Sequence, residues 1–82
     1  MGEPLLCHSH ATPNLRRVSG YLASYATAAL IQRLTAEHID SRTYDIPCAI
    51  DTMLVEGVNF MDLDTDAEFD FAYGILNRFV RL

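Results

Sequence analysis

With 82 residues the chain has room for one small domain, and half of its residues are apolar, which is more than so small a core can bury. Six arginines, no lysine and eleven acids give a net charge of −5, which excludes the dense phosphate contacts of a nucleic-acid-binding surface. The excess of apolar residues instead predicts a homodimer or a tight complex with another protein, for which a basic surface is the best electrostatic match.

Residues 1–11 show no periodicity, and we expect them to form an arm ahead of a single helical domain at residues 12–82. The arm lacks the basic and apolar segments of a secretory signal, which predicts a cytoplasmic protein whose two cysteines stay reduced. No membrane span is expected either. The longest uncharged run, residues 18–32, has 15 residues and includes polar side chains, whereas a bilayer needs about 20 apolar ones.

Three potential ligands of a transition metal lie close together in the arm: Cys7, His8 and His10. Structural zinc requires four ligands in a tetrahedron, and the fourth would have to come from His38 or Cys48. Nothing in the spacing points to either residue. We therefore interpret the cluster as polar histidines beside an incidental thiol, and we predict neither a metal site nor another cofactor.

The first helix is predicted to start at Thr12 and Pro13, where a capping hydroxyl precedes a proline in the first helical position. Apolar residues then recur every three or four positions as far as Leu34, which makes this helix the centre of the domain, buried on most sides. Gly20 is the point where it could break, and its end is expected at residues 38–41. Small residues that would let another helix approach closely lie along it: Ala23, Ala26, Ala28 and Ala29.

A second, short helix is predicted between Asp45 and Gly57. Pro47 suits its first turn after a cap at Asp45 or Ile46, and Gly57 suits the left-handed residue that ends a helix.

Cys48 lies in the first turn of this second helix, where amide groups can activate a thiol. His38 could act as its base, with Asp40 or Asp51 orienting the imidazole. No nucleophile signature surrounds the cysteine, and small buried cysteines are common in cores. We therefore interpret Cys48 as a core residue.

The last helix is predicted to start with a capping box over residues 65–68, in which Thr65 caps the helix and Glu68 reaches back to the Thr65 amide. One apolar line follows at spacings of three and four. A second apolar line lies beside it and comprises Phe71, Ile75 and Leu82. Because one buried face cannot hold both lines in so small a domain, the second line is the predicted interface.

Five carboxylates lie just before this helix and in its first turns, and we call them the acidic block: Asp62, Asp64, Asp66, Glu68 and Asp70. The spacing of the first three is that of the first ligands in an EF-hand loop, but Ala67 stands where glycine is needed and Tyr73 where a bidentate glutamate is needed. Helix capping accounts for Asp66 and Glu68. It leaves Asp62, Asp64 and Asp70 either solvated or facing a basic partner.

These patterns predict an all-α fold, a small helical bundle with a long central helix, a short second helix and an amphipathic C-terminal helix. No catalytic motif is present, and we expect a non-enzymatic protein-interaction module. In size and charge it is similar to small inhibitors and modulators of phages, plasmids and toxin systems, which block a surface such as a nucleic-acid-binding one on a partner protein. The residues expected to contact the partner are Asp62, Asp64, Asp66, Asp70, Phe71 and Ile75. The alternatives are an assembly subunit of a permanent oligomer and a small enzyme that depends on a metal or a thiol.

Overall fold

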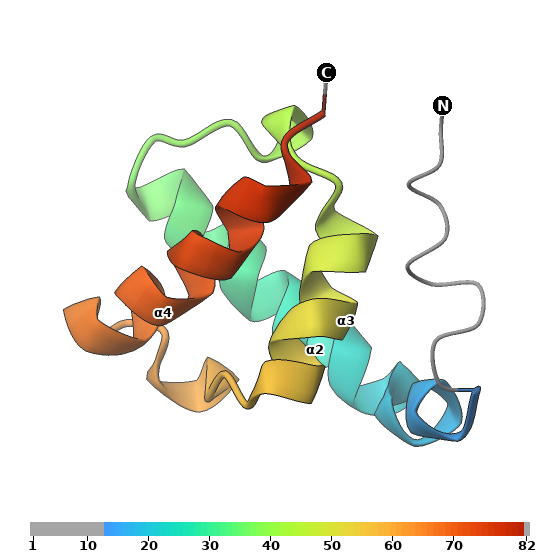
Figure 1. The fold of residues 1–82 in the computed structure, drawn as a ribbon. Helices are drawn as coiled ribbons and strands as arrows, with labels where there is room; N and C mark the ends of the chain where they lie inside the picture. Colours follow the sequence, from blue (N-terminus) through green and yellow to red (C-terminus); the bar gives the residue numbers. More distant parts are fainter. Residues whose placement is uncertain (1–12, 82) are drawn as a thin grey trace.

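The computed structural model describes the backbone of residues 13–81 and the side chains of residues 23–81. Within this part the chain forms three α-helices, namely α2 (Pro13–Ala36), α3 (Ile46–Glu56) and α4 (Asp66–Leu76), joined by loops that contain single 3-10 turns (Figure 1). The predicted all-α bundle is therefore confirmed. The predicted arm at residues 1–11, its Cys7, His8 and His10, and the Thr12 cap lie outside the described residues.

Helix α2 ends because His38, two residues after its last residue, adopts a left-handed conformation. His38 has φ 60°, and its N–H donates to the Thr35 carbonyl at 3.0 Å. The Ile39 N–H donates to the Leu34 carbonyl at 2.9 Å, which completes a Schellman motif. The helix consequently stops at Ala36, two residues before the predicted range, and Ile39 turns inward to pack against the core.

Both ends of α3 agree with the prediction. The Asp45 side chain accepts a hydrogen bond from the Cys48 N–H at 3.4 Å, as an N-cap does. Gly57 has φ 85°, and the N–H of Val58 donates to the Met53 carbonyl at 3.0 Å. Glycine is favoured at this position because a Cβ strains the left-handed conformation.

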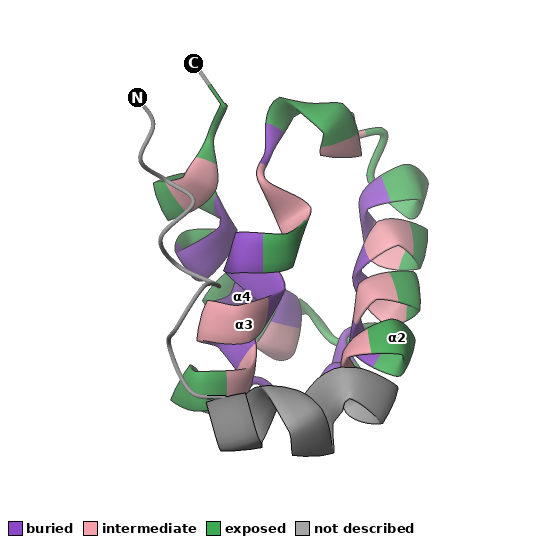
Figure 2. Cartoon of the chain, turned by 90° about the vertical axis from the view of Figure 1, so that its right-hand side faces the viewer, coloured by how far each residue is buried: buried purple, intermediate pink, exposed green. Residues whose placement is uncertain are grey.

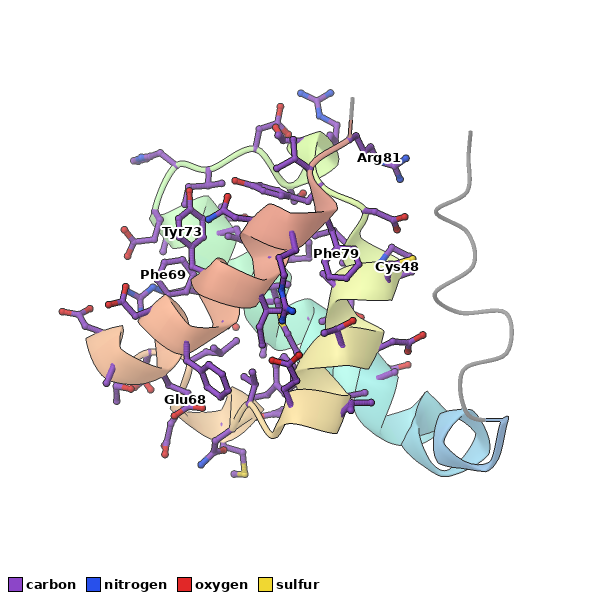
Figure 3. The ribbon with its side chains drawn as sticks, viewed as in Figure 1. Cys48, Glu68, Phe69, Tyr73, Phe79 and Arg81 are labelled. Carbon is purple, nitrogen blue, oxygen red and sulfur yellow. The ribbon has the colours of Figure 1, made fainter. Side chains whose placement is uncertain are left out.

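The C-terminal end of the chain is tied to the start of α3. Tyr44 and Val80 form an isolated antiparallel bridge, and the Asp45 N–H donates to the Phe79 carbonyl at 2.8 Å. The Arg81 Nε also donates to the Tyr44 carbonyl at 3.2 Å (Figure 3). The segment after α4 therefore closes the bundle by backbone pairing, which no sequence pattern indicated.

The core lies where α2 packs against α3, and α3 against α4 (Figure 2). Its largest fully buried side chains are Leu30, Leu34, Ile50, Met53, Leu76 and Cys48. The predicted apolar face of α2 is buried as expected. The prediction that α2 is buried on most sides is wrong, because Tyr25, Ala28, Gln32 and Ala36 leave its outer side exposed.

Truncation of a core side chain should cost more stability than truncation of a surface side chain. We expect Leu30→Ala to lower the free energy of unfolding by about 2–5 kcal/mol, because it removes buried methyl groups and leaves a cavity. Val55 is 62% exposed on α3, and Val55→Ala should stay within about 0.5 kcal/mol of the parent. Urea denaturation of the parent and of both variants measures the free energies of unfolding. Equal losses in both variants would contradict the described packing.

Candidate protein-interaction surface

Arg33 of α2 holds the loop between α3 and α4 in place. Its Nη1 donates to the carbonyl oxygens of Leu63 at 2.6 Å and of Thr65 at 3.4 Å. Its Nη2 pairs with Asp66 at 3.2 Å and with Glu37 at 2.8 Å. The planar fork of an arginine is suited to several acceptors at once. The loop, which carries Asp62 and Asp64 of the acidic block, is therefore fixed to α2.

The same guanidinium also covers an aromatic ring. Its central carbon lies 4.3 Å from the centroid of Phe69, and Phe69 stacks on Tyr73 with centroids 5.4 Å apart (Figure 3). Desolvation alone lowers the pKa of Arg33, but hydrogen bonds to Asp66 and Glu37 outweigh it and raise that pKa above its ordinary value. Arg33 is therefore a permanent cation whose charge is already matched within the fold.

A second set of hydrogen bonds closes the loop at Asn59. The Glu68 carboxylate accepts from the Asn59 N–H at 2.8 Å, and the Asn59 side chain binds the N–H of Met61 at 3.1 Å and the carboxylate of Asp62 at 3.0 Å. Thr65 caps α4 as predicted, since its Oγ1 accepts from the Glu68 N–H at 3.3 Å. The predicted return contact from Glu68 to the Thr65 amide is wrong, because that amide donates to the Asp62 carbonyl.

These contacts divide the five carboxylates of the acidic block. Asp62, Asp66 and Glu68 each bind a partner within the fold. Asp64 and Asp70 are exposed, and neither carboxylate makes a hydrogen bond or ion pair in the described part of the chain. Within the same residues, no three histidine, cysteine, aspartate or glutamate side chains are grouped to hold a metal ion.

A groove of about 400 Å³ lies between α2 and this loop. Its α2 wall consists of Tyr25, Ala28, Ala29, Gln32, Arg33 and Ala36. Its loop wall consists of Phe60, Met61, Leu63 and Asp64. We call it the Tyr25–Met61 groove, after its two most prominent side chains, which are 47% and 76% exposed. Large apolar side chains that are exposed beside one another, unlike isolated ones, are typical of a binding surface.

A second hollow of about 800 Å³ continues from the groove. It shares Tyr25, Phe60 and Met61 with the groove and adds Leu54 and Val58 as apolar lining. Tyr25 and Met61 therefore stand between two adjoining apolar hollows. The open surface extends from α2 across the loop to the end of α3.

The apolar line predicted as an interface on α4 is only partly at the surface. Phe71 is 43% exposed, whereas Ile75 is 3% exposed. The prediction that Ile75 contacts a partner is wrong. Because α4 packs against both α3 and the 3-10 turn Phe60–Asp62, its buried face is wider than one stripe and includes Ile75. Leu82 lies outside the described residues.

Tyr25 and Met61 were not predicted as site residues. The only signal was compositional, since Met61 ends an apolar run at residues 58–61 that directly precedes the acidic block. Tyr25 looked like part of the apolar face of α2. Its position on the outer side of α2 follows only from the packing of α3 against the opposite side.

Cys48, which lies near the start of α3 (Figure 3), is buried as predicted. It is disulfide-bonded, so the expectation of two reduced cysteines is wrong for this structure. The only other cysteine, Cys7, lies outside the described residues. A disulfide sulfur is not a thiolate, which removes the nucleophile hypothesis for Cys48. His38 was the proposed base and instead occupies the left-handed position that ends α2.

No protein-family model matches the chain, and no curated protein or solved structure shows a significant similarity to it. Among residues 13–81, no helix combines the length and apolar character that crossing a membrane requires.

The difference between the paired and the unpaired carboxylates of the acidic block can be tested by measuring the stability of variants. We expect Glu68→Ala to lower the free energy of unfolding by about 1 kcal/mol, because the Asn59 amide loses a charged acceptor. Asp70→Ala, two residues further along the same helix, should stay within about 0.5 kcal/mol of the parent. Thermal denaturation followed by circular dichroism measures both. Equal destabilisation would mean that Asp70 also has a structural role.

Proposed function

We propose that this chain is a non-enzymatic protein-interaction module that binds a basic surface of a partner protein and acts as its inhibitor or modulator, of the phage or mobile-element type. The observation that carries the proposal is the Tyr25–Met61 groove with Asp64 in its lining. Apolar anchors and an unmatched carboxylate lie in one place, which supplies both contact area and charge selectivity.

The two anchors are of residue types that suit a contact surface. Tyr25 offers a large apolar ring with a hydroxyl that can remain hydrogen-bonded, a combination enriched at interfaces. Met61 is unbranched and polarisable, so it can adapt to the shape of a partner. Both side chains are exposed in this structure, and burial against a partner would remove their apolar surface from water.

The electrostatic field of the domain favours a cationic partner. Residues 37–82 contain ten acids and three arginines. Two of these arginines are matched by ion pairs, Arg42 with Asp40 at 3.0 Å and Arg78 with Glu56 at 2.9 Å. The unmatched charge is therefore predominantly negative, and it steers basic surfaces toward the domain.

A second candidate is an assembly subunit that forms a permanent oligomer. The observation in its favour is that Val55 and Phe71 are exposed on α3 and α4 without lining the groove. A homodimer through these side chains should raise the melting temperature as protein concentration rises. Melting that is independent of concentration removes this candidate and leaves the hetero-complex.

Removal of the two unmatched acids should weaken partner binding without unfolding the domain. We expect Asp64→Asn with Asp70→Asn to bind a partner captured from the native host about tenfold more weakly than the parent does. The control of equal charge is Asp40→Asn with Glu56→Gln, which also removes two negative charges, from exposed acids that line neither hollow. Because Asp40 and Glu56 pair with Arg42 and Arg78, circular dichroism verifies that this variant is folded. Titration calorimetry with the purified partner measures the three affinities. Equal affinities for both double variants would contradict a local role for Asp64 and Asp70.

The proposal places the module in the cytoplasm, where thiol systems reduce accessible disulfides. The disulfide of Cys48 is shielded from such systems, because the Cys48 side chain is buried. We therefore expect native extract that is quenched with acid and alkylated under denaturing conditions to show modified cysteines only after reductant is added. Mass spectrometry of the intact protein measures the modification. Modification of both cysteines without reductant would contradict a retained disulfide.

A further inference from the structure

We infer that the Tyr25–Met61 groove receives a basic amphipathic helix of the partner, laid along α2 with its apolar face on the groove and its cationic residues toward Asp64. This inference rests on the proposed function and specifies the shape and chemistry of what the groove binds. It does not depend on the identity of the partner.

The length of the groove matches a helical ligand. Its α2 wall runs from Tyr25 to Ala36 with lining residues three and four apart, so that it follows one face of the helix. Eleven steps of 1.5 Å give about 16 Å, or about three turns. A partner helix aligned with this wall can place apolar residues at the usual spacing of three, four and seven.

The cross-section of the groove also favours a helix. Ala28 is exposed and Ala29 is half-buried, so the α2 wall is low and another backbone can come close. On the opposite side Phe60, Met61 and Leu63 form an apolar wall. The alternative mode, strand addition, needs an exposed sheet edge, and residues 13–81 contain only an isolated bridge.

Charge determines which helix fits. The groove lining contains two charged residues, Arg33 and Asp64. Arg33 is already matched by Asp66 and Glu37, whereas Asp64 has no partner in the described part of the chain. The net field in the groove is therefore negative. A second copy of this chain docked groove to groove would bring two negatively charged linings against each other, which disfavours self-association through this face.

A synthetic helix tests the inference without knowledge of the natural partner. The probe is a fluorescein-labelled, amidated peptide of about 18 leucines and lysines, with the leucines three and four apart so that one face is apolar. A scrambled peptide of the same composition has the same charge but no apolar face. A third peptide carries glutamate in place of lysine. Fluorescence anisotropy with the full chain measures each affinity.

We expect the leucine–lysine probe to bind at least about tenfold more tightly than the scrambled and glutamate peptides. Ala28→Trp fills the groove and should weaken probe binding about tenfold. Ala67→Trp is the matched control, since Ala67 is an exposed helical alanine that lines neither hollow, and its affinity should equal that of the parent. Circular dichroism of both variants verifies that they are folded.

Three results would overturn the inference: no binding of the probe, equal binding of the scrambled peptide, or undiminished binding by a folded Ala28→Trp variant. These results are distinguishable from failure of the proposed function. If a captured partner still binds in a manner that requires Asp64 and Asp70 while the probe does not bind at the groove, the module binds a basic surface of another shape. The proposed function then stands and the helical ligand is rejected.

Discussion

Arg33 joins two parts of the chain that are 30 residues apart, because its guanidinium donates to the carbonyl oxygen of Leu63 as well as to Thr65. Backbone carbonyls in a loop need partners, and here one side chain supplies them from the neighbouring helix. The same group covers Phe69 and is neutralised by Asp66 and Glu37. The attachment of the loop to α2, and with it the position of one wall of the groove, depends on Arg33.

These contacts leave one carboxylate in the groove, that of Asp64, without a partner among the described residues, and the functional proposal rests on it. Asp66 is occupied by Arg33, and Glu68 is occupied by Asn59, so these acids stabilise the loop. Asp64 has no such partner and lies in the groove beside Met61. The domain thus separates carboxylates that hold the loop from a carboxylate that is available to a ligand. A cationic, apolar ligand meets complementary chemistry in the groove, whereas an anionic one does not.

Local signals were sufficient to predict the helices, because caps and breakers act over a few residues. Asp45, Gly57 and Thr65 terminate or start helices in the structure as their chemistry requires. The candidate site was less predictable because it depends on contacts between distant segments. Periodicity placed Ile75 at a surface, but α4 buries a broader face than one stripe. No local pattern distinguishes Arg33, which organises the loop, from Arg42, which pairs with its near neighbour Asp40.

Amide hydrogen exchange in an Arg33→Lys variant tests the central role of Arg33 most directly. Lysine keeps the charge but cannot reproduce the planar set of donors, so the loop amides of Asp62 and Thr65 should exchange at least about tenfold faster than in the parent. The core amides of α3 should exchange at the parental rate, and Arg42→Lys should leave both regions unaffected. Unchanged protection of the Asp62 and Thr65 amides in a folded Arg33→Lys variant would contradict the account.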